Sequence, residues 1–420
     1  MKIRVWLLLS ILAAGITWLF VSRILGPWEH FVDVEGGNLK AQMGDLYPRW
    51  VGTRELLLHG QNPYGPEVSH EIQMAYYGHA IDQQLGKPGV GVVDEQRFAY
   101  PIYVVFFLAP SVYSDFPHLQ LWAAVILAVL VAVSVILWMG LLRWAPPPVM
   151  VLAIVLLVVS SPQIVQGLRL RQLGLAVGFL LALSAWCAAR NHLAAAGIVL
   201  AMATIKPQMV ILPLAWFLFW GVSAWPKRWR LLAGFGISLS VLVGLGELVL
   251  PGWVGFFLSG LVAYRKYVYA TSLACAGLGT RAGWGVSVIA VGGLLLAAWR
   301  NRQAEAGSSA FIRTLSGSFV VAALVLPLLP PFNQVVLLLP AMAIIRDWTA
   351  VPRIGRRIFA FVLMWPCIAC FALIMAAPRV NYPGRLPLLP SAITLFDPLI
   401  LLLLLVTTRV SPSEPAAASF

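Results

Sequence analysis

Most of the side chains that can accept or donate a proton lie in one polar segment, residues 26–97. This segment contains ten of the sixteen carboxylates and four of the six histidines of the 420-residue chain. Within it, Asp45 stands close to Tyr47, Arg49 and Trp50. A positioned carboxylate can take the proton of an acceptor hydroxyl group in a transfer reaction, and aromatic rings favour the level of a membrane interface. Asp45 is therefore the first candidate for a catalytic base.

Other interpretations of these residues stay open. Asp45, followed by a turn and Pro48, is also typical of a helix N-cap, which is a purely structural role. Asp33 is a second candidate carboxylate, although it has no aromatic neighbours. The spacing of the histidines matches no standard metal-ligand motif, so they are interpreted as solvated loop residues. They include His59, His70 and His79, with Glu71 nearby.

Basic and amide side chains between apolar segments are candidates for binding an anionic group. Lys206 lies between two apolar stretches, where a charge is costly and marks a functional position with a partner such as phosphate. Arg171 with Gln172 forms a second cluster, and Arg265 with Lys266 a third; the planar guanidinium group suits phosphate. Snorkelling to the membrane surface, or ordinary contact with lipid headgroups, would explain these positions without a functional site.

Composition determines the class of protein. The chain is 60% hydrophobic and 11% charged, with a mean hydropathy of +0.86, so it uses lipid as its solvent. The net charge of +13 comes from short basic clusters between apolar segments, which indicates membrane topology and not nucleic-acid binding. The four cysteines form no disulfide framework. These features predict an all-α, polytopic membrane helix bundle.

The apolar segments predict about eleven to thirteen membrane-spanning helices, the first of them a retained helix over residues 5–25 that starts in the cytoplasm. Basic clusters occur at alternate connections, which the positive-inside rule assigns to the cytoplasm. The remaining connections are then outside, together with the first loop, residues 26–98. Residues 1–410 would form one integral membrane domain, and 411–420 a short disordered tail. The connections predicted to lie outside, besides the first loop, are near 161–172, 206, 251–281, 328–332 and 378–391.

Two local features bear on how the first loop is held. Short amphipathic helices on the membrane surface are predicted over residues 49–59 and 67–85. The stretch from Tyr100 to Leu142 must cross the membrane an odd number of times, yet it carries two apolar segments. The first of these, at 100–113, is short for a span, which needs about twenty residues. The sequence alone leaves this conflict open.

A series of short motifs runs from Asp45-x-Tyr47 through Gly-Gln-Asn-Pro-Tyr at 60–64 and Phe-Ala-Tyr-Pro at 98–101 to Gln172 and Lys206. Their order resembles the polytopic glycosyltransferases of family 87, the polyprenyl-phosphate-mannose-dependent mannosyltransferases of actinobacterial glycolipid synthesis and their relatives. Three motifs depart from the family pattern: its Tyr-Pro-Pro, its Gly-Gln and its later Pro-x-x-x-His-like segment. They read here Tyr100-Pro101-Ile102, Arg171-Gln172 and Pro331-Phe332-Asn333-Gln334.

The resemblance implies a GT-C fold whose first outer loop supplies the catalytic acidic residue, here Asp45. The donor would be a mannose- or arabinose-like sugar on a polyprenyl phosphate, and the acceptor an extracytoplasmic lipid or glycan hydroxyl. In an inverting transfer Asp45 is the base and Lys206 holds the phosphate; a retaining transfer would need a second carboxylate, such as Asp33 or Glu35. The expected substrate-binding residues are Asp33, Tyr47, Arg49, Trp50, Asn62, Tyr64, Tyr100, Arg171, Gln172, Lys206, Arg265 and Lys266.

The same resemblance implies a multi-pass protein of the bacterial inner (plasma) membrane with its active site on the extracytoplasmic side. Its partners would be the lipid-linked donor, the acceptor and membrane lipids, with no nucleic acid. No cofactor is expected, and a leaving group with one phosphate does not demand a metal. The alternative function is a transporter or flippase of a lipid-linked or anionic solute. That function favours ionisable residues in mid-span and repeat symmetry, but Glu247 alone approaches a span centre and no repeat is found.

Overall fold

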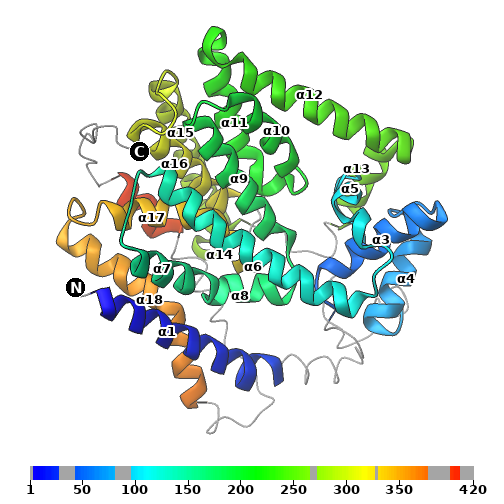
Figure 1. The fold of residues 1–420 in the computed structure, drawn as a ribbon, viewed down its shortest axis with the longest axis horizontal. Coiled ribbons are helices and arrows are strands. Elements are labelled where there is room, and N and C mark those ends of the chain that lie inside the picture. Colours follow the sequence, from blue (N-terminus) through cyan, green and yellow to red (C-terminus); the bar gives the residue numbers. More distant parts are fainter. Residues whose placement is uncertain are drawn as a thin grey trace.

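The computed structural model describes residues 3–27, 43–80, 96–264, 272–326, 330–376 and 398–406. Within these ranges every regular element is a helix (Figure 1), which confirms the predicted all-α class. Three residues predicted to bind substrate, Asp33, Arg265 and Lys266, lie outside the described residues, as does the tail 411–420.

The helices follow one another along the chain with short connections. The first two are α1 (Ile3–Phe20) with its π-helical continuation η1 (Val21–Leu25), and the others are α3 (Leu46–His59), α4 (Pro66–Tyr77), α5 (Val104–Leu108), η4 (Ala109–Ser111), α6 (Phe116–Leu141), α7 (Pro148–Val159), α8 (Pro162–Arg169), α9 (Leu173–Ala189), α10 (Leu193–Ala203), α11 (Pro207–Ser223), α12 (Trp225–Val249), α13 (Trp253–Tyr264), α14 (Leu273–Leu278), α15 (Thr280–Asn301), α16 (Ser309–Val325), η5 (Pro331–Leu337), α17 (Leu338–Arg346) and α18 (Arg353–Ala376).

Proline sets the start of several of these helices. α7, α8 and α11 each begin on a proline, at Pro148, Pro162 and Pro207. A proline in the first turn has the backbone angle that a helix needs and lacks an N–H that would have no partner there. These prolines therefore fix where each new helix begins after a short turn, and the turn before Pro207 contains Lys206 of the candidate site.

Fewer helices than predicted are long and apolar enough to cross a membrane. Among the described residues four qualify, or up to six if each of two bent helix pairs counts as one span. The bent pairs are α7 with α8, which meet at 59°, and the two halves of α18. The other apolar helices, such as α9, α10 and α11, have 17 residues or fewer. The polytopic helix bundle is confirmed; length and composition give four to six spans among the described residues, where the sequence predicted eleven to thirteen.

The stretch from Tyr100 to Leu142 contains one helix of spanning length, α6. The preceding apolar piece forms only the short helices α5 and η4, and both pack against α3 of the first loop. Val104 and Val105 of α5 are fully buried in this contact region. The piece is apolar because it forms the core beneath the first loop, so one crossing accounts for the stretch.

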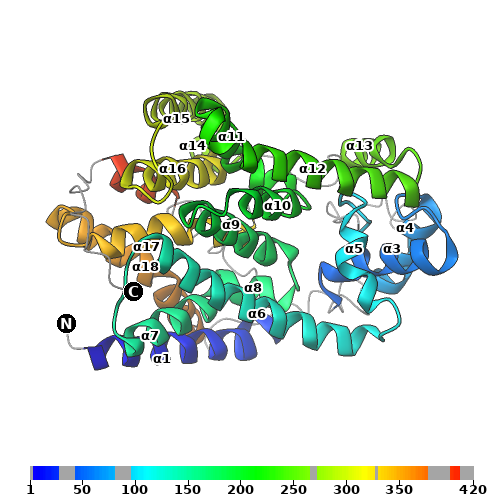
Figure 2. The ribbon, with the colours of Figure 1, turned by 45° about the horizontal axis from the view of Figure 1, so that its top comes forward.

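The two predicted helices of the first loop are present with shifted bounds, and they pack on the rest of the protein. α3 begins three residues earlier than the predicted 49–59, and most of its first ten residues are buried. α4 covers 66–77 instead of 67–85 and ends at Gly78, which has a positive φ of 78°. Figure 2 shows α3, α4, α5 and α13 gathered at one end of the bundle. The location of these helices at the membrane surface stays a prediction.

Connections assigned to the same side of the membrane meet in the structure. At the end with the first loop, the Asp45 N–H donates to the Leu170 carbonyl at 2.9 Å. The Tyr103 hydroxyl donates to the Thr204 carbonyl at 3.1 Å. At the other end the Gln303 side chain donates to the Ser223 carbonyl at 2.6 Å. The described residues thus form one bundle with two ends, and the charge pattern sorts their connections correctly between them.

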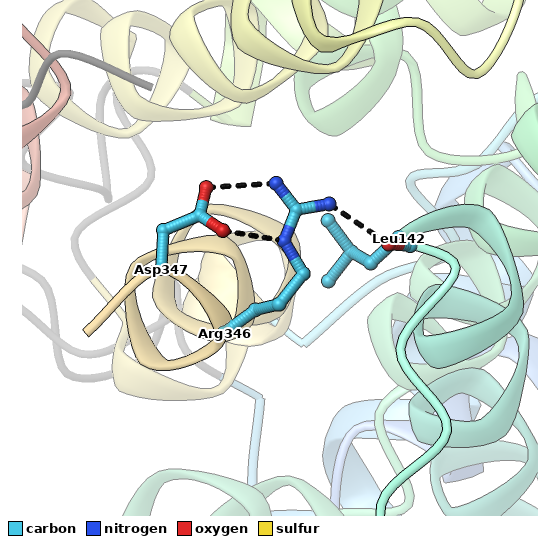
Figure 3. Close-up of polar contacts among 3 residues, drawn as sticks. All are labelled: Leu142, Arg346 and Asp347. Atoms are coloured by element: carbon cyan, nitrogen blue, oxygen red, sulfur yellow. Dashed lines mark hydrogen bonds and ion pairs between the residues drawn. The ribbon is translucent and has the colours of Figure 1, made fainter. Parts of the chain in front are cut away.

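Two arginines tie helix ends together at the end away from the first loop. Arg346 at the end of α17 donates to the Leu142 carbonyl at 2.8 Å and forms two 2.7 Å hydrogen bonds with Asp347 (Figure 3). Arg228 of α12 is buried and lies over the Trp220 ring, 3.8 Å from its centroid. The Arg228 guanidinium donates to four backbone carbonyls, those of Trp220, Arg302, Gln303 and Ala304.

Replacing Arg228 with methionine is expected to destabilise the protein by about 2–4 kcal/mol, because buried carbonyls lose a charged donor. The measurement is unfolding of the purified protein in detergent. Arg230→Met, at an exposed position two residues away, is the control and should change stability little. Activity per folded molecule should stay at the wild-type level in both variants; a stability equal to wild type in Arg228→Met would contradict a structural role.

Candidate functional site

Lys206 is the centre of a buried polar cluster at the end of the bundle that carries the first loop. It lies in the turn between α10 and α11, and its side chain is 5% exposed. Its ammonium donates to the Gln172 side-chain oxygen at 3.0 Å and to the Asn333 side-chain oxygen at 2.9 Å. The Phe332 ring lies beneath it, with the centroid 5.2 Å from Nζ. The turn before α9 and the helix η5, which are far apart in the sequence, therefore meet at Lys206.

Asp45 lies near this cluster and does not cap its own helix. It occupies the N-cap position of α3, but its side chain makes no capping hydrogen bond, so the purely structural interpretation of Asp45 is not supported. Burial lowers the pKa of Lys206, while the Asp45 carboxylate acts in the opposite direction and Arg49 adds to the lowering. The Asp45 N–H donates to the Leu170 carbonyl, and Gln172, two residues further on, accepts a hydrogen bond from Lys206. These contacts place Asp45 near the lysine, and its role as a base stays a prediction.

The backbone on both sides of Asp45 is fixed by contacts with its neighbours. Its N–H donates to Leu170 at the end of α8, and its carbonyl accepts from the Arg49 guanidinium at 2.8 Å. Gly44 has a φ of 67°, and a Cβ on it would lie 2.9 Å from the Leu170 oxygen. A residue with a side chain would therefore be strained in conformation and also collide with this backbone. Glycine at 44 allows the first loop to dock on the end of α8.

Replacing Gly44 with alanine is expected to lower kcat by at least about tenfold, because an error of about 1 Å in the position of a reacting group costs up to about a hundredfold. Stability should fall by about 1–2 kcal/mol from the left-handed backbone alone. Gly60 provides the control: its φ is 68°, but no atom lies within 4 Å of a Cβ there. Gly60→Ala should lower stability to a similar extent while kcat stays unchanged. Equal kcat values for the two variants would contradict the positioning role of Gly44.

Arg49 and Tyr100 border the cluster. The Arg49 guanidinium carbon lies 4.9 Å from the centroid of the Tyr100 ring. Burial raises the pKa of Tyr100, Arg49 opposes this rise, and Asp45 adds to it. The Tyr64 hydroxyl donates to the Tyr100 carbonyl at 2.6 Å. The Tyr64 hydroxyl thus fixes the backbone of Tyr100. The Tyr100 ring lies close enough to Asp45 and Arg49 for both charges to affect its pKa.

Asn62 and Tyr64 shape the turn after α3. The Asn62 side-chain oxygen accepts the Tyr64 N–H at 3.0 Å, and the Asn62 carbonyl accepts the Gly65 N–H at 2.9 Å. This arrangement is an Asx-type turn, in which an asparagine side chain replaces a backbone acceptor. The contacts indicate that Asn62 and Tyr64 position Tyr100, and their direct contact with substrate stays a prediction.

Tyr47 and Trp50 pack into the core of the first-loop region. The Tyr47 ring lies 4.8 Å from that of Phe116 and 6.1 Å from that of Trp50. The Trp50 ring N–H donates to the Ser111 carbonyl at 3.1 Å. Both side chains are at least nine-tenths buried. These contacts connect α3 with η4 and α6, so the described geometry gives the two aromatics a packing role.

Arg171 is held by the chain itself. Its guanidinium donates to the carbonyls of Gln120 and Arg169, and its backbone has a positive φ of 51°. Burial and the neighbouring Arg169 lower the pKa of Arg171. Its neighbour Gln172 contacts Lys206, but the contacts of Arg171 lead to α6. Arg171 therefore fixes the turn that presents Gln172, and its direct contact with a phosphate stays a prediction.

Sequence reasoning missed Asn333 as a member of the site. The position of Asn333 in the sequence could have indicated a site residue, because segment 330–334 lies between two apolar stretches on the same predicted side as Lys206. An amide carries no charge, however, and nothing in the pattern indicated what it contacts. Gly174 was also missed: a Cβ on it would lie 3.0 Å from Lys206 Nζ and 3.4 Å from the Asn333 oxygen. The space around the lysine depends on glycine at this position.

One loop histidine, His59, lies close to two carboxylates, Glu55 and Glu71. His59 contacts Glu55, with 2.7 Å between its Nδ1 and the carboxylate, and these two lie on successive turns of α3. In the described ranges no three His, Cys, Asp or Glu side chains are placed to hold a metal ion. Burial and the nearby Glu55 raise the pKa of Glu71, while Arg54 and His59 lower it.

Comparison with known proteins identifies the family. The model of glycosyltransferase family 87 matches residues 98–327, more than half of the chain. No curated protein and no solved structure gives a significant match. The matched range contains Tyr100, Gln172 and Lys206, while Asp45 and Asn333 lie outside it and join the same cluster through the fold. The chain belongs to glycosyltransferase family 87.

Proposed function

We propose that this glycosyltransferase moves a mannose- or arabinose-like sugar from a polyprenyl phosphate to a hydroxyl group of a lipid or glycan acceptor. The observation that carries the proposal is the buried Lys206, held by Gln172 and Asn333, at the end of the bundle where the Asp45 backbone is bonded to Leu170, two residues before Gln172. A sugar phosphate ester needs a base for the attacking hydroxyl and a cation for the departing phosphate. The cluster offers one residue for each task.

Asp45 acts as the general base in this proposal. As the acceptor oxygen attacks the anomeric carbon, its proton passes to the Asp45 carboxylate, and the bond from that carbon to the phosphate oxygen breaks. One displacement of this kind inverts the anomeric centre. A second carboxylate would be required as nucleophile for retention. The candidates for that second carboxylate, Asp33 and Glu35, lie outside the described residues, and the proposal takes the single displacement, which needs Asp45 alone.

Lys206 holds the phosphate in this proposal. An ammonium group has three N–H donors, and the amide oxygens of Gln172 and Asn333 accept two of them. The third N–H is directed to the phosphate when the donor binds. Because the leaving phosphate is already anionic, it needs a cation and no acid. The two amides keep the lysine in place, so its charge is organised before the reaction begins.

The site faces the extracytoplasmic side of the bacterial inner membrane in this proposal, with the N-terminus in the cytoplasm. Support comes from the positive-inside rule. The connections with the basic clusters near 228 and 300–302 meet at the end opposite the first loop. A lipid-linked donor then reaches the cluster from within the membrane, and an acceptor hydroxyl reaches it from the aqueous side.

The proposal is tested with purified protein in nanodiscs, a panel of polyprenyl-phosphate sugars and a lipid extract as acceptor. The expected result is a glycolipid that forms only with a lipid-phosphate donor and whose new linkage has the opposite anomeric configuration to the donor. Sugar nucleotides in place of the lipid donor should give no product. Absence of transfer with every lipid donor, together with solute flux in liposomes, would contradict the proposal and favour a transporter.

A further inference from the structure

A small pocket lies between α16, α17 and the helical segment 398–406, at the end of the bundle away from the first loop. Its volume is about 30 Å³, and it is open on one side. Since one water molecule needs about 10–15 Å³, the pocket admits one or two oxygen-sized groups. Ser309 begins α16 and Arg346 ends α17. The pocket therefore lies where apolar helices end, which is the level of lipid headgroups.

One wall of the pocket is a single face of α16. The residues of α16 that line it are Ser309, Ile312, Arg313 and Ser316. They are spaced i, i+3, i+4 and i+7, which places them on the same side of a helix. Three of the four are polar, although α16 is one of the apolar helices of the bundle. This face thus presents a cation and two hydroxyl groups to one small space.

Ser316 is the residue that indicates a ligand. It is 0% exposed, and its hydroxyl has no hydrogen-bond partner among the described residues. Ser318, two positions further along α16, is equally buried, but its hydroxyl donates to the Leu315 carbonyl at 2.7 Å. A buried hydroxyl without a partner costs free energy. An acceptor oxygen bound in the pocket satisfies it.

The charges around the pocket favour an anion. Two arginines, Arg313 and Arg346, line it together with one carboxylate, Asp347. Both oxygens of Asp347 accept hydrogen bonds from Arg346 at 2.7 Å (Figure 3), so Arg313 supplies the surplus positive charge. The first turn of α16, at Ser309, adds the positive end of the helix dipole. Guanidinium and hydroxyl donors of this kind suit a phosphate group.

The remaining wall of the pocket is apolar. It is formed by Ala343 and Ile344 of α17 and by Leu404 and Leu405 of the segment 398–406. A free phosphate ion gains nothing from such a surface, whereas the acyl chains of a lipid bury apolar area on it. A polar face and an apolar face on one pocket therefore favour a lipid headgroup over a free ion.

We propose that this pocket binds the phosphate group of an anionic membrane lipid. One phosphate oxygen accepts from the Ser316 hydroxyl, the charge of the phosphate lies at Arg313, and the acyl chains lie on Leu404 and Leu405. Basic pockets between membrane helices are known sites for anionic headgroups. The bound lipid connects α16, α17 and the segment 398–406. This site is separate from the Lys206 cluster and does not depend on the proposed function.

The test measures lipid binding to the delipidated, full-length protein in detergent by native mass spectrometry. The probe is dioctanoyl phosphatidylglycerol, and the comparison is dioctanoylglycerol, which lacks the phosphate. The phospholipid should bind at least about tenfold more tightly, and inorganic phosphate should not displace it. Equal binding of the two lipids would overturn the proposal. Displacement by inorganic phosphate as effective as by the phospholipid itself would assign the pocket to a free anion and also overturn it.

Two variants remove the polar contacts, and each has a matched control. Arg313→Gln and Ser316→Ala should each weaken phosphatidylglycerol binding by about tenfold, because each removes a hydrogen bond to a charged group. Arg353→Gln removes an exposed arginine at the start of α18, and Ser318→Ala removes a buried hydroxyl of α16; both lie outside the pocket lining. These controls should bind as wild type does. Unchanged affinity in both pocket variants, or equal losses in pocket and control variants, would overturn the proposal.

Thermal unfolding gives a second readout that does not use sugar transfer. Phosphatidylglycerol should raise the Tm of the wild type and of Arg353→Gln, and it should raise the Tm of Arg313→Gln much less. Without lipid, Ser316→Ala should be at least as stable as the wild type, because it removes a buried hydroxyl that has no protein partner. A lipid-free Ser316→Ala variant less stable than the wild type would overturn the role of Ser316. Failure of the proposed transferase function leaves these results unaffected.

Discussion

Replacing Asp45 with asparagine is expected to lower kcat for sugar transfer by about a thousandfold, because a positioned general base contributes about 10²–10⁴-fold. Asparagine has nearly the same shape but takes up no proton from the acceptor. The fold should persist, since the Asp45 side chain makes no capping hydrogen bond to α3 and its backbone contacts with Leu170 and Arg49 do not involve the carboxylate. The measurement is kcat with saturating donor, together with thermal unfolding.

Asp115→Asn is the matched control for this result. Asp115 precedes α6 as Asp45 precedes α3, it is exposed, and its carboxylate lies 2.6 Å from the His118 ring nitrogen. An exposed pair of this kind contributes little, so transfer should continue at the wild-type rate. If Asp45→Asn retained wild-type turnover, Asp45 would not be the base, and Asp33 would be the next carboxylate to replace.

Replacing Lys206 with methionine is expected to raise KM for the donor by about a hundredfold, because a buried, charge-assisted hydrogen bond to the phosphate is lost. It also leaves the amide oxygens of Gln172 and Asn333 without their donor, so a loss of stability is expected as well. Lys227→Met removes an exposed lysine at the other end of the bundle and should change neither quantity. Wild-type donor KM in a folded Lys206→Met variant would remove the lysine from phosphate binding.

The Lys206 site also predicts the direction of a pH dependence. Burial lowers the pKa of Lys206, and the ammonium form binds phosphate while the neutral amine does not. kcat/KM should therefore fall as pH rises through a value below the usual lysine pKa of about 10.4. Asn333→Leu should move this fall to lower pH, because the amide oxygen that favours the ammonium is removed. A kcat/KM that is constant from about pH 6 to about pH 10 would contradict this assignment.

The sequence predicted much of the helix bundle because membrane helices have a strong local signal. The first apolar helix, predicted over residues 5–25, coincides closely with α1 and its continuation η1, which together cover residues 3–25. The number of spans could not be predicted in the same way. Apolar composition alone does not distinguish a helix that faces lipid from one buried in protein, and α5 is of the second kind.

The site was predicted in part for a similar reason. Asp45 and Lys206 are ionisable residues in unusual places, and such residues give a signal in the sequence. Asn333 and Gly174 act through an uncharged amide and through the lack of a side chain, so they become visible only when the fold brings distant turns together. The Tyr64 hydroxyl donates to the backbone carbonyl of Tyr100, a contact that the sequence did not indicate.

The division of labour between Asp45 and Lys206 is tested most directly by the affinity of two variants for polyprenyl phosphate, the lipid that remains after transfer. Binding to Asp45→Asn and Lys206→Met is compared with wild type in nanodiscs of the same composition. The account predicts that Asp45→Asn binds at least as tightly as wild type although it does not turn over, while Lys206→Met binds at least about tenfold more weakly. Equal affinity of both variants and the wild type, or equal losses in the two variants, would contradict a site in which one residue takes the proton and the other holds the phosphate.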